Sequence, residues 1–168
     1  MVHICCAPCF TFVNKKLEEH KIIGYFYNPN IYPKWEYENR LESLREYNKI
    51  VGGDMIFDSG DQNEYLNGIF GNPKRCEFCY WYRLDKTAEK AKENGCDAFT
   101  STIFISPYQK HELAKEVCIA IEKKHKIKFY YEDFRVGWKE SREIARKYNL
   151  YMQKYCGCIL SKIERGKF

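Results

Sequence analysis

The sequence predicts an α/β fold of three layers, in which helices cover both faces of a mostly parallel, five-stranded sheet. Five short runs of apolar or β-branched residues alternate with longer segments of helical periodicity. No internal repeat, low-complexity tract or linker rich in Pro, Gly or Ser interrupts this order. Strands that are separated by helices pair in parallel and need a helix layer on each side, which is the reason for this fold class.

The predicted strands lie at residues 2–5, 22–27, 54–57, 98–103 and 128–131. The helical patterns between and after them cover residues 10–20, 34–51, 76–94, 108–125 and 138–148. The third helix ends at Asn94-Gly95, a common C-terminal stop signal. This alternation predicts one βαβ-type domain that spans residues 1–168.

Composition restricts the class of protein. The chain has no run of 18 apolar residues and no secretory signal at its start, so we expect a cytoplasmic protein with no membrane partner. Nine cysteines in a cytosolic chain of this size indicate metal or redox chemistry rather than structural disulfides. The net charge of +5 is modest and permits an anionic partner without requiring one.

The residues that follow the predicted strands are unusual. In an open parallel sheet, ligands bind beyond the carboxyl ends of the strands. The first strand runs into Cys5-Cys6-Ala7-Pro8-Cys9, and the second into Asn28. The fourth and fifth strands lead to Ser101 with Tyr108, and to Asp133. Thiols and polar groups therefore collect at one edge of the predicted sheet.

Seven of the nine cysteines fall in three groups: Cys5/Cys6/Cys9, Cys76/Cys79 and Cys156/Cys158. Thiolates are soft ligands that bind zinc or iron–sulfur clusters, usually four to a centre. A structural zinc site would leave three of these cysteines without a role, so the count favours an iron–sulfur site. Metal-free dithiol chemistry remains an alternative. Cys96 and Cys118 have the pattern of buried structural residues.

The Cys156-Gly157-Cys158 sequence is a C-x-C pair, in which a disulfide would close a strained ring. Strained disulfides are easily reduced, which suits a redox relay better than a structural bridge. The alternatives are that this pair also binds metal or stays as free thiols. The chain has neither of the two common glycine-rich phosphate-binding motifs, so no nucleotide cofactor is indicated.

Five motifs occur in an order that resembles one known family: His3-Ile4-Cys5-Cys6-Ala7-Pro8-Cys9, Asn28-Pro29-Asn30-Ile31, Arg75-Cys76-Glu77-Phe78-Cys79-Tyr80, Ser101-Thr102-Ile103-Phe104-Ile105-Ser106-Pro107-Tyr108 and Tyr155-Cys156-Gly157-Cys158. Together they resemble the cobalamin-independent epoxyqueuosine reductases, the QueH family, over essentially the whole chain. No cysteine of these motifs is missing.

The resemblance implies reduction of the epoxide of epoxyqueuosine to queuosine, at the wobble position of a tRNA anticodon loop. It also implies a Rossmann-like fold related to the adenine-nucleotide α-hydrolase-like (HUP) folds. A [4Fe-4S] cluster on Cys5, Cys6, Cys76 and Cys79 and a redox-active Cys156/Cys158 pair follow from the same resemblance. Cys9 is then available for the substrate or for a second, mononuclear metal, either iron or zinc.

For the reaction itself, four residues at or near strand ends are candidate proton donors or metal ligands: Asp133, Tyr108, His3 and Glu132. Asp133 is the preferred one. The partner is expected to be tRNA rather than DNA, with phosphates contacted by basic side chains and the extruded base stacked on aromatic rings. The predicted contacts are Asn28, Tyr32, Trp35, Tyr37, Arg40, Lys74, Arg75, Tyr80, Trp81, Ser101 and Tyr108. A solvated helix face explains Arg40 equally well. The electron donor is unknown from the sequence.

Two alternative functions remain at this stage. One is an iron–sulfur tRNA sulfur transferase of a related fold, which would need an ATP-binding loop after the first strand that this chain lacks. The other is a zinc-stabilised binding module in which the extra thiols have no function.

Overall fold

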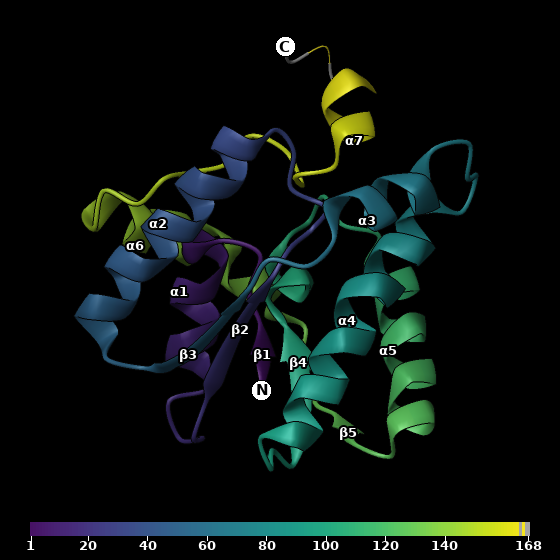
Figure 1. Ribbon diagram of the computed structural model, residues 1–168. Helices are drawn as coiled ribbons and strands as arrows, with labels where there is room; N and C mark the ends of the chain where they lie inside the picture. The colour runs from purple at the N-terminus through teal and green to yellow at the C-terminus, as the bar shows by residue number, and fades with distance from the viewer. Residues whose placement is uncertain (165, 167–168) are drawn as a thin grey trace.

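One parallel sheet forms the centre of the structure, a computed structural model that describes residues 1–164 and 166 (Figure 1). Its five strands are parallel and lie in the order β3-β2-β1-β4-β5. The strands are β1 (Val2–His3), β2 (Ile23–Tyr27), β3 (Asp54–Asp58), β4 (Ala98–Ser101) and β5 (Lys128–Phe129). The predicted α/β sandwich is confirmed, whereas its relation to the HUP folds stays a prediction.

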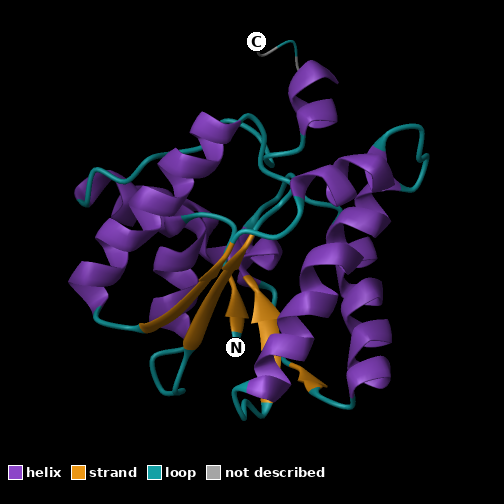
Figure 2. Cartoon of the chain, viewed as in Figure 1, coloured by secondary structure: helices purple, strands orange, loops and turns teal. Residues whose placement is uncertain are grey.

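Helices cover both faces of the sheet (Figure 2). α1 packs against α6 and α2 on one face, and α4 packs against α3 and α5 on the other. The helices are α1 (Ala7–Lys16), α2 (Lys34–Val51), α3 (Gln62–Ile69), α4 (Arg75–Glu93), α5 (His111–His125), α6 (Trp138–Lys147) and α7 (Ile159–Glu164). Of two short 3-10 helices, η1 (Thr102–Ile105) follows β4, and η2 (Phe134–Gly137) precedes α6. Among the described residues, no helix is long and apolar enough to span a membrane.

The largest differences from the prediction lie in short elements. α3 and α7 were not predicted, because both are too short to show a clear helical period. The first helix begins at Ala7 rather than at residue 10, because Cys6 is its extended N-cap residue and Pro8 suits the first helical turn. The fourth strand ends at Ser101, whose hydroxyl accepts a hydrogen bond from the Ile103 backbone N–H and starts η1.

The apolar core lies between the sheet and each helix layer. Tyr25 and Phe26 on β2 and Phe99 on β4 are at most 1% exposed. Burial of one such large apolar side chain contributes roughly 1.5–3 kcal/mol. This packing makes the sheet a rigid support for the loops at the carboxyl ends of its strands, the upper edge in Figure 1.

Candidate thiol site

The direction of the strand connections reverses beside β1. The chain moves from β1 to β2 and β3 on one side, and then returns to β4 and β5 on the other. Such a switch point leaves a crevice between the loops that follow the two central strands. Cys5 and Cys6 follow β1, and Thr102 follows β4. The Cys5 backbone N–H donates a hydrogen bond of 3.1 Å to Thr102 Oγ1, so the two loops meet in this crevice.

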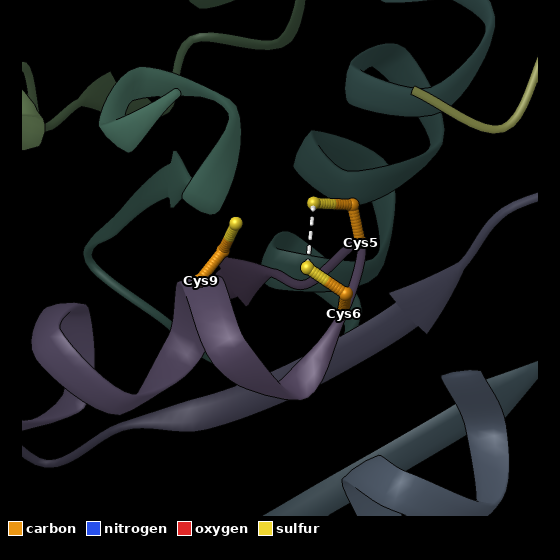
Figure 3. Close-up of side chains that lie close together, drawn as sticks. All are labelled: Cys5, Cys6 and Cys9. Carbon is orange, nitrogen blue, oxygen red and sulfur yellow. Dashed lines mark hydrogen bonds between the residues drawn. The ribbon is translucent and has the colours of Figure 1, made fainter. Parts of the chain in front are cut away.

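Three thiols form a compact group in this crevice, which we call the N-terminal thiol cluster. The Sγ atoms of Cys5, Cys6 and Cys9 all lie within 4.8 Å of one another (Figure 3). Cys6 is the N-cap residue of α1, and Cys9 stands in its first turn. Cys5 is half-buried and the other two are buried. A strand end followed directly by a helix therefore brings these thiols together.

The three thiols of this cluster differ in pKa. Hydrogen bonds from the Cys6 and Cys9 thiols hold the pKa of Cys5 well below its usual value. Burial raises the pKa of Cys6 to about 12, and hydrogen bonds to Cys5 and Cys6 raise the pKa of Cys9 well above its usual value. Three thiols so close together cannot all ionise without a cation. The cluster therefore has the chemistry of a metal site.

The remaining four of the seven predicted site cysteines line a cavity of about 180 Å³. We call these residues, Cys76, Cys79, Cys156 and Cys158, the second thiol group. The first two lie in the first two turns of α4, and the last two precede α7. Cys79 and Cys158 pack with Tyr65 of α3, which is 1% exposed. Burial raises the pKa of both Cys79 and Cys158. This group is assembled from segments that are far apart in the sequence.

A larger cavity, of about 500 Å³, is lined by cysteines from both sets of thiols. Cys5 and Cys9 line it, and so does Cys156 of the second thiol group. Tyr108, Gln109 and Cys156 line both cavities. Six of the seven predicted thiols therefore face two cavities that share a wall. This agreement concerns only where the six cysteines lie. Which of them bind a metal stays a prediction.

Two buried arginines lie beside the thiols. Arg83 of α4 is 3% exposed, and its charge acts on both Cys79 and Cys5. Arg40 of α2 is 1% exposed, pairs with Glu36 at 2.7 Å, and acts on Cys6 and Cys5. Because Arg40 is buried, the alternative that it only forms a solvated helix face is wrong, and its contact with RNA stays a prediction. Buried cations at this position stabilise thiolates or a negatively charged metal centre.

Arg40 also holds the segment that carries the C-x-C pair. It donates hydrogen bonds to the backbone carbonyl oxygens of Tyr155 at 2.9 Å and Cys156 at 3.4 Å. The Glu36 and Arg40 spacing of four residues in a helix was the sequence signal for the ion pair. Nothing in the sequence indicated its contact with the C-terminal segment.

Asn28 and Ser101 are fully buried and hold His3 or its loop in place. The Asn28 side-chain amide donates to the Ile4 carbonyl at 2.8 Å, and Ser101 Oγ lies 2.9 Å from His3 Nδ1. Burial lowers the pKa of His3 to about 4, so this imidazole is neutral at pH 7. Neither side chain reaches the surface in this structure, and their contact with substrate stays a prediction.

Asp133 has a clear local role. Its carboxylate accepts a hydrogen bond from the Arg135 backbone N–H at 3.1 Å, which caps η2, and another from Arg135 Nε at 2.8 Å. This pairing lowers the pKa of Asp133 to about 2. The carboxyl is therefore ionised at neutral pH and does not line either cavity. Its catalytic role stays a prediction, with capping as the function that its contacts support.

The predicted RNA contacts are spread over the surface. Tyr108 is 71% exposed and stands at both cavities, and Arg75 lines the smaller one. Trp35 is 51% exposed on α2, and Trp81 is half-buried on α4, but neither lines either of the two thiol cavities. The structure thus brings Tyr108 and Arg75 to the thiols and leaves the two tryptophans apart from them.

Three cavity residues were missed by the sequence reasoning. Trp138 and Arg142 of α6 form one wall, with the Arg142 guanidinium 3.9 Å from the centre of the Trp138 ring. An Arg142 N–H also lies 3.9 Å from Cys9 Sγ. Gln153 Nε2 lies 2.8 Å from Cys6 Sγ. All three come late in the chain, after the last strand, where no motif marked them.

Comparison with known proteins gives one consistent result. The model of the family described as "Epoxyqueuosine reductase QueH" matches residues 1–164. A protein of that name from Dehalococcoides mccartyi is 37% identical over 98% of this chain and 93% of its own length. One from Streptococcus pyogenes is 36% identical over 99% of this chain and 71% of its own, and one from Thermotoga maritima is 28% identical over 98% and 91%.

Proposed function

Because this chain belongs to the epoxyqueuosine reductase QueH family, we propose that its thiol site reduces epoxyqueuosine in tRNA to queuosine, in the cytoplasm. The observation that carries the site assignment is the convergence of cysteines from three segments on two cavities that share a wall. The sulfur-transferase and zinc-module alternatives are not favoured by the family match.

The reaction sets the chemical requirements of the site. Two C–O bonds of the epoxide break, a C=C bond forms, and the oxygen leaves as water. The substrate must therefore receive two electrons and two protons. Buried thiols can deliver the electrons, and the larger cavity, at about 500 Å³, has the size of a small-ligand site. An anticodon-loop nucleotide can enter such a cavity when it is turned out of the stack.

We assign the cofactor as a [4Fe-4S] cluster on Cys5, Cys6, Cys76 and Cys79. The residues fit this group in donor type and in charge: the thiols are buried or half-buried, and the Arg40 and Arg83 cations face them. When bound, the cluster would supply electrons and a Lewis-acidic iron. The chain's own contribution is to hold the thiolates and to balance their charge.

Cys9 is not one of the four assigned ligands, although its Sγ lies within 4.8 Å of those of Cys5 and Cys6. It belongs to the N-terminal thiol cluster, lines the larger cavity and lies near Arg142. We assign it to a second metal, iron or zinc, or to direct contact with the substrate. The Arg142 N–H and Gln153 Nε2, at 3.9 and 3.7 Å, are the donors that would stabilise its thiolate.

Tyr108 is the best-placed residue for contact with the substrate base. It is exposed at the mouth of both cavities, and its ring meets Trp138 edge-on, with the ring centres 5.8 Å apart. A base stacked on this ring would lie beside Cys5, Cys9 and Cys156. Stacking of this kind contributes about 1–3 kcal/mol per base.

Iron content tests the ligand assignment. Serine in place of Cys5, Cys6, Cys76 or Cys79 should lower bound iron and visible absorbance in anaerobically purified protein, and should abolish formation of queuosine in tRNA. The matched control is Cys96→Ser, because Cys96 is half-buried but lines neither thiol cavity. Full iron content in the four variants would refute the ligand set. Zinc in place of iron would refute the cluster, whatever the activity.

A further inference from the structure

The two thiols of the C-x-C pair have different surroundings. Cys156 is half-buried and lines both cavities. Cys158 is 9% exposed and lines only the smaller one. A molecule that enters through the larger cavity therefore meets the sulfur of Cys156 first.

Hydrogen bonds to the main chain keep this difference in place. The carbonyl oxygen of Cys156 accepts from Arg40 and from the Asn30 side chain, each at 3.4 Å. The carbonyl oxygen of Gly157 accepts from the Tyr32 backbone N–H at 2.9 Å. Because two consecutive carbonyls are held by groups from α2 and the β2–α2 loop, the segment cannot turn over to exchange the two thiols.

Cys158, the less exposed thiol, packs against a buried tyrosine that has no role in the proposed reaction. Tyr65 is 1% exposed and packs with Cys79 and Cys158. Its hydroxyl lies beside both thiols, and it has no fully formed hydrogen bond among the described residues. A buried hydroxyl without a partner is unfavourable, so its position favours a sulfur atom that accepts a hydrogen bond from it in the reduced enzyme.

We propose that Cys156 is the sulfur that exchanges with an external dithiol reductant, and that Cys158 is the inner sulfur, held by the positioning residue Tyr65 beside Cys79. This inference rests on the proposed function, in which Cys156 and Cys158 form the redox pair. It adds the chemical class of the electron donor, the order of attack and the role of Tyr65.

One thiol of the external dithiol loses its proton and attacks Cys156 Sγ of the disulfide. An S–S bond between the donor and Cys156 forms, and the Cys156–Cys158 bond breaks. The Cys158 sulfur leaves with the electron pair and takes up the released proton. The second thiol of the donor then loses its proton and attacks the donor sulfur that is bonded to Cys156, so the mixed disulfide breaks and Cys156 leaves and takes up that proton. The donor ends as a disulfide, and the pair ends as two thiols.

Single-cysteine variants of the full-length holoprotein test the order of attack. Cys158→Ser leaves Cys156, and Cys156→Ser leaves Cys158. With 5,5′-dithiobis(2-nitrobenzoate) as the probe, we expect the mixed disulfide on Cys156 to form at least about tenfold faster than that on Cys158, because access limits the rate. Mass spectrometry of the peptide that spans residues 155–162 identifies the modified sulfur. Equal or reversed rates would overturn the proposal.

A separate measurement distinguishes this inference from the proposed function. The wild-type protein is equilibrated in dithiothreitol redox buffers, and the same peptide is examined for the Cys156–Cys158 disulfide. If the disulfide never forms, the redox pair itself fails. If it forms but the probe prefers Cys158, only the order of attack fails.

Tyr65→Phe tests the positioning role, because it removes one hydroxyl and keeps the ring. We expect the equilibrium constant for reduction of the pair to fall by up to about tenfold, a shift of about 30 mV for two electrons. The control is Tyr82→Phe, whose hydroxyl donates to Glu64 at 2.6 Å instead of facing a thiol. An unchanged constant in Tyr65→Phe, or an equal change in both variants, would overturn the role of Tyr65.

Discussion

The N-terminal thiol cluster and the second thiol group are built in opposite ways. The first comes from five consecutive positions, Cys5 to Cys9, at the end of β1 and the start of α1. The second needs α3, α4 and the C-terminal segment to pack together. A local cluster depends on backbone geometry near it, whereas an assembled group depends on every contact that holds its parts together. Substitutions that affect assembly should therefore disturb one group and spare the other.

The largest expected effect is that of Arg40→Met. It leaves Glu36 buried and without its cation, and it releases the Tyr155 and Cys156 carbonyls. Loss of one partner of a buried ion pair costs about 3–5 kcal/mol. Urea unfolding measures this loss, and thiol labelling should show a larger increase for Cys156 than for Cys9.

The matched control is Arg45→Met on the same helix, where the side chain is about half exposed and should change stability by no more than about 0.5 kcal/mol. If Arg40→Met exposed Cys9 as much as Cys156, the distinction between a local and an assembled group would be lost.

Gly157→Ala should have the next largest effect. Gly157 has φ of +109°, and an added Cβ would lie 2.9 Å from Ile31 Cγ1. We expect a loss of about 2–3 kcal/mol, from backbone strain and the clash together. Gly71→Ala separates these causes, because Gly71 has φ of +69° with no atom within 4 Å of the added Cβ. It should cost less, and thermal unfolding of both variants compares them.

Thr102→Val tests the N-terminal thiol cluster. The Thr102 hydroxyl accepts from the Cys5 backbone N–H at 3.1 Å and lies 3.3 Å from Cys5 Sγ. Removal of this acceptor should cost about 1–2 kcal/mol and lower the reactivity of Cys5, because the Thr102 hydroxyl helps to hold the pKa of Cys5 down, with little effect on Cys158. Thr100→Val is the control, since its buried hydroxyl has no partner among the described residues. Equal losses of stability in the two variants would show that the hydrogen bond from the Cys5 backbone N–H to Thr102 does not stabilise the fold.

Asp61→Ala should have the smallest effect. The Asp61 carboxylate caps α3 by accepting from the backbone N–H groups of Asn63 at 2.8 Å and Glu64 at 3.0 Å. Its loss should cost about 1 kcal/mol and loosen the helix that carries Tyr65. Hydrogen exchange of α3 measures this effect. Asn67→Ala, at an exposed position in α3, should not speed exchange, and a similar change in both variants would contradict a specific capping role.

Much of the fold was predictable from the sequence because it depends on periodic patterns. The strands at β2 and β3 and the long helix α2 lie within a residue or two of their expected limits. The short helices α3 and α7 were missed because their sequences cover too few turns to show a period. Both carry or adjoin parts of the second thiol group, so the least predictable elements are the ones that complete this group.

In the site too, some residues could be predicted from the sequence and others could not. The cysteines were recognised by type and spacing, and the structure places six of the seven at two cavities that share a wall. Tyr65 and Arg142 gave no such signal, because a side chain that lies beside a thiol looks like any other residue of an amphipathic helix until its neighbours are known. The choice of cluster ligands stays a proposal.

By itself, the sequence determined the α/β class, the order of strands and helices, and the N-terminal thiol cluster, because each of these depends on residues that are close together in the chain. Only the tertiary structure decided that Cys158 is buried while Cys156 is half-buried, that Arg40 is buried, and that Tyr65 packs with Cys79 and Cys158. These features depend on which distant segments pack against each other, and packing is a property of the whole folded chain.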